Sequence, residues 1–200
     1  MATDTMAGPS GGGSHPLRFD VEYPGELSRW LIFVKWLLAI PHFIILYLLS
    51  IATGVVTFIA FFAILFTKQY PRSLFDFVVN ANRWSANVTA YIFLLRDEYP
   101  PFSWDAGTYP VVYDVDYPAG LSRWLIFVKW LLVIPNLIVL LFVYIGAMLA
   151  LWVAWFAILF TKRYPQGLFK FVVGALRWTQ RVNAYTNLLR DEYPPFSMAP

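Results

Sequence analysis

The sequence predicts an all-α membrane protein with two tandem transmembrane helical hairpins, each preceded by a short strand and followed by a cytoplasmic amphipathic helix. Three observations predict these four spans. The 200 residues are 59% hydrophobic and only 14% charged, whereas soluble domains carry charge on about a quarter of their residues. The second half of the chain repeats the first. Each half also contains one long apolar stretch with almost no charge.

The repeat covers nearly the whole chain. Residues 20–103 align with residues 114–197 without a gap, and the string LLRDEYPPFS occurs unchanged in both. Such a tandem duplication predicts two similar units related by a pseudo-twofold axis. We therefore divide the chain into a tail over residues 1–16, repeat 1 over residues 17–104 and repeat 2 over residues 105–200.

The tail is predicted to be disordered, because it is small, polar and rich in glycine. No basic stretch precedes an apolar core in it, and Gly11, Gly12 and Gly13 stand where that core would be. The tail therefore lacks the pattern of a secretory signal.

Each repeat begins with a short predicted strand. Residues 17–23 and 111–117 place apolar side chains at alternate positions, which is the period of a half-buried strand. A strand alone has unpaired edges, so the two strands either pair with each other across the pseudo-twofold axis or remain separate.

A hairpin is predicted in each long apolar stretch, over residues 30–66 and 124–160. As one helix, either stretch would be ~55 Å long, and a hydrocarbon core is only ~30 Å thick. Two arms of roughly 17 residues fit better. The turns are expected near residues 50–54 and 144–147, where glycine occurs.

The positions of the basic residues predict the orientation. All 15 Lys and Arg residues lie outside residues 36–67 and 130–161. Basic residues accumulate on the cytoplasmic side of membrane proteins. We therefore expect a multi-pass protein of the cell membrane with both termini in the cytoplasm and the pseudo-twofold axis along the membrane normal.

Tryptophan and lysine mark the predicted membrane interface. Lys35 and Lys129 lie one turn inside the apolar stretches, each between two tryptophans. We interpret them as lysines that extend to the lipid head groups beside a tryptophan belt. Anion binding at the interface of the repeats is the alternative. The flanking residues are Trp30, Trp36, Trp124 and Trp130.

Residues 71–95 and 165–189 are predicted to form the amphipathic helices. Apolar residues recur every three or four positions, and a polar stripe lies opposite them. A charged stripe favours the membrane interface over the hydrocarbon core. The predicted lipid or partner contacts on these helices are Arg83, Trp84, Lys170, Arg177, Trp178 and Arg181.

One polar residue interrupts each apolar stretch at the same place, His42 in the first and Asn136 in the second. We interpret both as polar groups that hydrogen-bond a neighbouring helix. A buried proton-transfer or metal group is the alternative for His42. The chain has no Cys, and its 12 Asp and Glu residues lie outside the predicted spans. We therefore expect no catalytic residue, no metal site and no cofactor.

The repeated strings WLIFVKWLLxIP, FTKxYP and RDEYPPF resemble the bacterial membrane proteins grouped as domain of unknown function 4389. This resemblance covers nearly everything after the tail. It implies one or two such units in a chain and implies no activity.

The composition excludes disorder and a main role in nucleic-acid binding, since the net charge is only +3. We expect a small non-enzymatic structural or accessory membrane protein. Its expected partners are lipids with anionic head groups on the cytoplasmic side, and further copies of the chain or a larger membrane complex. The alternative is a passive channel or transporter with a pathway between the repeats.

Overall fold

The computed structural model describes residues 15–200, so most of the predicted tail lies outside the described residues. Repeat 1 contains β1 (Leu17–Val21), α1 (Leu31–Leu38), α2 (Ile40–Thr67) and α3 (Arg72–Ile92). Repeat 2 contains β2 (Val111–Val115), α4 (Leu125–Leu132), α5 (Ile134–Thr161) and α6 (Gln166–Thr186).

The two strands pair with each other in an antiparallel sheet, so pairing across the repeats is the one of the two alternatives that forms. Phe19 lies opposite Tyr113 at its centre, and these two residues occupy equivalent positions in the repeats. The pseudo-twofold axis therefore passes between them. One face of the sheet is buried, and its side chains are Leu17, Phe19, Val21, Val111, Tyr113 and Val115.

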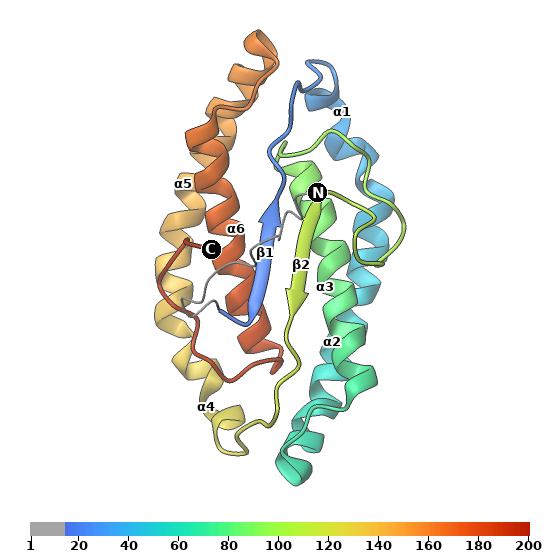
Figure 1. The fold of residues 1–200 in the computed structure, drawn as a ribbon, viewed down its shortest axis with the longest axis vertical. Helices are drawn as coiled ribbons and strands as arrows, with labels where there is room; N and C mark the ends of the chain where they lie inside the picture. The colour runs from blue at the N-terminus through green and yellow to red at the C-terminus, as the bar shows by residue number, and fades with distance from the viewer. Residues whose placement is uncertain (1–14) are drawn as a thin grey trace, which may run out of the picture.

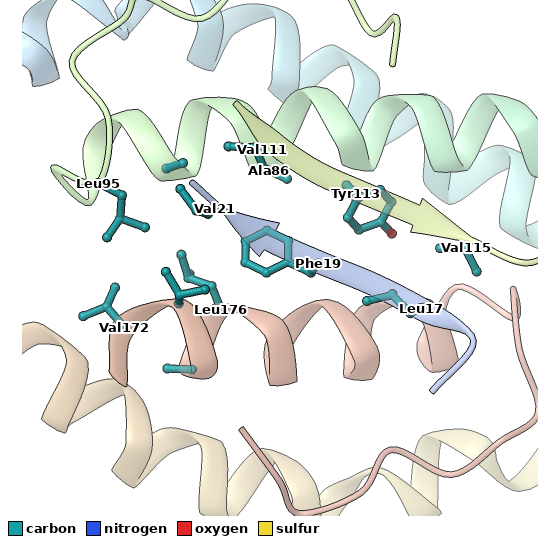
Figure 2. Packing of buried hydrophobic residues seen from close by; sticks show 14 of the residues in the cluster. Leu17, Phe19, Val21, Ala86, Leu95, Val111, Tyr113, Val115, Val172 and Leu176 are labelled. Atoms are coloured by element: carbon teal, nitrogen blue, oxygen red, sulfur yellow. The ribbon is translucent and has the colours of Figure 1, made fainter. Parts of the chain in front are cut away.

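The elements form layers along the long axis of the molecule (Figure 1). The sheet lies over α3 and α6. These two helices in turn pack against α2 and α5, which lie at the two sides of the view. Each strand packs on the helix of the other repeat, β1 on α6 and β2 on α3. Figure 2 shows inward side chains of the strands beside α3 and α6, with Ala86 and Leu176 in the same cluster.

The prediction of hairpins is wrong, because each apolar stretch contains one long helix without a turn at its middle. α2 continues through residues 50–54 and α5 through residues 144–147. A single glycine costs a helix only about 1 kcal/mol, and neither segment contains the proline that would end one. The helical breaks fall instead at Ala39 and Val133, two residues before Pro41 and Pro135. Proline has no N–H to donate to the preceding turn.

The predicted amphipathic helices exist, but they do not lie free on the surface. α3 is covered on one side by α2 and on another by β2. α6 is more deeply buried, with 13 of its 21 residues buried. An amphipathic sequence pattern indicates that one face of a helix is apolar. It does not indicate whether the polar face contacts water or a strand of the sheet.

Hydrogen bonds join the two repeats at both ends of the molecule, and we call the set at each end a clasp. The Leu27 amide donates to the Lys162 carbonyl at 2.8 Å, and the Arg29 guanidinium donates to the Phe160 carbonyl at 3.1 Å. The Tyr23 hydroxyl donates to the Tyr164 carbonyl. The same three contacts recur with the repeats exchanged, from Leu121 to Lys68, from Arg123 to Phe66 and from Tyr117 to Tyr70. Each repeat therefore completes the other.

Candidate membrane-contact surface

The helices α1, α2, α4 and α5 form a large exposed apolar surface. Among the described residues, 36 of the 44 exposed large hydrophobic side chains lie in residues 30–67 and 124–160. Two stretches, Ile40–Thr67 and Leu125–Thr161, are long and apolar enough to cross a membrane. Only 11% and 22% of their most apolar segments is buried within the protein, whereas a core helix of a soluble protein would be mostly covered. This surface suggests membrane association.

The sheet lies level with the middle of α2. The middle of α2, around Thr53, and the middle of α3 line one cavity. From the middle of α3, Arg83 donates from Nε to the Tyr113 carbonyl at the centre of the sheet, at 3.0 Å. On the outer face of the sheet, Arg18 pairs with Asp114 at 2.6 Å, and both are about half exposed. An orientation with α2 along the membrane normal would therefore place exposed charges at the depth of the bilayer centre.

Exposed basic residues lie at both ends of the helical surface. Arg29 lies at the end of α5, and Arg123 lies at the end of α2. Lys68 and Lys162 follow the last residues of α2 and α5. Because the pseudo-twofold axis makes the two ends equivalent, the positive-inside rule favours neither end of a helix that spans the bilayer. When both helices lie in the membrane plane, all four cations border the same surface.

Four predicted contact residues, the tryptophans Trp30, Trp36, Trp124 and Trp130, lie on this surface, and each is more than 60% exposed. The lysines between them do not extend to the surface. Lys35 is only 2% exposed, and its Nζ lies 2.7 Å from the Arg96 carbonyl and 2.8 Å from Asp97 Oδ1. Lys129 repeats this arrangement with the Arg190 carbonyl and Asp191. The interpretation of these lysines as interfacial is therefore wrong.

The reason lies in the segment after each amphipathic helix. RDEYPP returns to the start of the apolar stretch and brings a carboxylate and a carbonyl to each ammonium. An aromatic ring from α3 or α6 lies beside the same ammonium. Lys35 Nζ lies 4.9 Å from the centre of the Tyr91 ring, and Asp97 also accepts the Ser28 amide. A buried charge needs such partners, since an unpaired one is costly in an apolar interior.

His42 and Asn136 perform the same structural task in the two repeats. Trp84 Nε1 donates to His42 Nδ1 at 3.1 Å, and Trp178 Nε1 donates to Asn136 Oδ1 at 2.8 Å. Both acceptors are fully buried. These hydrogen bonds agree with the interpretation of both residues as polar groups bonded to a neighbouring helix. Trp84 and Trp178 are buried, so neither contributes to the exposed surface.

Substitutions at His42 have a matched reference in repeat 2. We expect His42→Asn to change the free energy of unfolding by less than about 1 kcal/mol, because Asn136 already accepts the equivalent indole N–H. His42→Leu leaves a buried indole donor unpaired and is expected to cost about 1–3 kcal/mol. Equilibrium unfolding of both variants in one detergent measures the difference. Equal losses in the two variants would contradict this role.

The basic residues predicted as contacts on the amphipathic helices differ in their burial and in their hydrogen-bond partners. Arg177 donates from Nε to the Phe19 carbonyl at 2.8 Å, as Arg83 does to β2. These two arginines satisfy central carbonyls of the strands. Arg181 donates to the Ser197 and Ala199 carbonyls, and burial beside Arg177 lowers the pKa of its guanidinium. Of the predicted contacts on these two helices, Lys170 alone is exposed.

Sequence reasoning missed the residues that join the repeats. Tyr23, Leu27 and Arg29 lie outside the apolar stretches, and they show no catalytic or metal-binding pattern. The available signal was their recurrence, since both repeats read DVxYPxxLSRW. Within residues 15–200, no group of three or more His, Asp or Glu side chains is placed to hold a metal ion.

The fold and surface define a class: a tandemly repeated, mostly helical protein with a small sheet and an exposed apolar helical layer suited to a membrane. The chain belongs to the family described as Domain of unknown function (DUF4389), whose model matches residues 29–103 and 123–198. The two matches correspond to the two repeats. Comparisons with curated proteins and with solved structures found no match.

Proposed function

We propose that this protein is a non-enzymatic membrane protein that lies in the plane of one leaflet and acts as a structural or accessory subunit. In this arrangement α2 and α5 are embedded, the sheet lies in water, and the pseudo-twofold axis stands along the membrane normal. The observation that carries the proposal is the position of the charged sheet face at the middle of the long helices. A charged group at the bilayer centre costs several kcal/mol, and the interface imposes no comparable cost.

The charges and side chains of the surface support the in-plane arrangement. Amphipathic elements bind membranes through buried apolar area together with attraction between basic residues and anionic lipids. The tryptophans at the start of α1 and α4 suit the level of the head groups. The sheet face carries both signs of charge, with Arg18 placed between Asp114 and Asp116. It is the surface available to a protein partner.

Depth measurements with spin labels test the arrangement, and the natural chain has no Cys that would interfere. We expect labels at Ile51→Cys and Ile145→Cys, which are equivalent positions on α2 and α5, to be accessible to oxygen. A label at Val112→Cys on the outer face of the sheet is expected to be accessible to a water-soluble relaxation agent. All three positions lie near the middle of the long axis. Equal depths for all three labels would contradict the proposal.

The accessory role has its own test. Mild extraction from the native membrane is expected to retain a protein companion in fixed stoichiometry. Val112 lies near Asp114 in the strand and is 55% exposed. We expect Val112→Glu to release that companion without releasing the protein from vesicles. A protein that is consistently extracted without a companion would contradict the accessory role, and the depth measurement would remain valid.

A further inference from the structure

A polar cavity lies among α2, α3 and the end of α6, where the two repeats meet. Its volume is about 280 Å³. α2 contributes the apolar Leu46 and Leu49 and the polar Ser50 and Thr53. The remaining polar lining comes from Asn82 and Ser85 of α3 and from Asn183 and Asn187 at the end of α6.

Most polar side chains that line this cavity make no hydrogen bond within the described part of the protein. Among the described residues, the side chains of Thr53, Ser85, Asn183 and Asn187 make no hydrogen bond. The Asn82 side chain also lines the cavity, and it lies against the buried Tyr113 hydroxyl. The side chains of Thr53, Ser85, Asn183 and Asn187 therefore leave hydrogen-bond donors and acceptors for a ligand in the cavity.

The cavity is specific to one side of the molecule. The positions equivalent to Asn82 and Asn187 are Leu176 and Phe93, and the position equivalent to Ser50 is Tyr144. The duplication therefore does not produce the polar lining by symmetry, and the two repeats have diverged where this cavity lies. α6 forms with Leu176 at the position of Asn82, so this helix does not require an amide there.

The chemistry of the lining defines the ligand. No charged side chain lines the cavity, and amides and hydroxyls both donate and accept hydrogen bonds. Such a set suits an uncharged polyhydroxyl group. The neighbouring leucines suit an acyl chain or glycerol backbone. An amphiphile with a sugar head group matches both parts of the lining.

The proposed in-plane arrangement brings such an amphiphile to the cavity. With α2 and α5 embedded, α3 and α6 lie between them (Figure 1). Embedded interfacial helices reach about 5–10 Å into the boundary between head groups and acyl chains. A lipid between α2 and α5 therefore directs its head group at α3 and α6. We propose that this cavity binds the uncharged sugar head group of a glycolipid, an inference that rests on the proposed function.

The test compares lipids retained by the full chain in vesicles of phosphatidylcholine that contain a minor fraction of a monoglucosyl diacylglycerol. Maltoside detergents are avoided, because they carry the same chemistry. The double variant Asn82→Leu and Asn187→Phe installs the residues of the opposite repeat at both positions. Thr179→Ala is the control, since the Thr179 hydroxyl already bonds to the Ala175 carbonyl.

We expect the natural chain and the Thr179→Ala control to enrich the glucolipid over phosphatidylcholine by about tenfold, as two added hydrogen bonds would. The double variant is expected to show no enrichment while it keeps its helical content. No enrichment by the natural chain, or equal enrichment by the double variant, would overturn the inference. Spin-label depth on the same samples separates the causes. In-plane depths without enrichment would refute the cavity alone, and equal depths at all three labels would refute the proposed function and this inference with it.

Discussion

Asp97→Ala is expected to lower the free energy of unfolding by about 3 kcal/mol. Asp97 is the carboxylate that pairs with Lys35 at 2.8 Å, and the lysine is only 2% exposed. The substitution leaves an ammonium in an apolar interior with one carbonyl and one aromatic ring as partners. Removal of one member of a buried ion pair costs more than most single substitutions, because the remaining charge is not compensated.

Three further variants make this prediction specific. Asp191→Ala is expected to have the same effect through Lys129. Lys35→Met removes the buried charge itself and leaves Asp97 partly exposed, so its expected cost is smaller, about 1 kcal/mol. Arg18→Ala breaks an exposed pair and is expected to cost less than about 0.5 kcal/mol. Equilibrium unfolding of the four variants in one detergent measures the loss in free energy of unfolding for each and so gives their order. A cost for Lys35→Met equal to that for Asp97→Ala would show that charge burial is not the cause.

Neither repeat is expected to fold alone as a monomer. Each strand has its only described pairing partner and its supporting helix in the other repeat. The clasp contacts of Tyr23, Leu27 and Arg29 likewise end in the other repeat. A separated repeat would therefore expose the apolar face of its strand and leave the turn after its long helix without a partner.

Coexpression of residues 1–104 and 105–200 as separate chains measures this dependence. We expect them to copurify in a one-to-one complex with the helical content of the intact protein. Residues 105–200 expressed alone are expected to aggregate or to pair with a second copy, because the two clasps are equivalent. Arg29→Ala and Arg123→Ala together are expected to weaken the complex. A folded monomer of residues 105–200 would contradict the interlocked arrangement.

The sequence predicted the repeats and the strands better than it predicted how each apolar stretch folds. The duplication was sufficient to propose a pseudo-twofold arrangement, and the alternation at residues 17–23 was sufficient to propose the strands, but the sequence left open whether they pair. The hairpins failed because hydrophobic length alone cannot distinguish two short helices from one long helix. The distinction depends on the elements that pack beside the apolar stretch, and α3 packs along α2.

The candidate surface was predictable in part. Trp30 and its equivalents were recognised because an exposed tryptophan next to an apolar run is a local feature. Lys35 was misinterpreted because its partner, Asp97, is 62 residues away in the sequence, and long-range pairing leaves no local pattern. The cavity was not predicted, although Asn82 and Asn187 already differed between the aligned repeats.

Labelling at the two ends of α2 tests the central claim most directly. Glu26→Cys and Gln69→Cys place exposed thiols near opposite ends of the helical layer, separated along α2 by a helix ~42 Å long. Sealed vesicles of uniform orientation are treated with a membrane-impermeant maleimide before and after lysis. The in-plane arrangement predicts that both thiols, and Val112→Cys on the sheet, react from the same side. Reaction of Glu26→Cys and Gln69→Cys from opposite sides would contradict it.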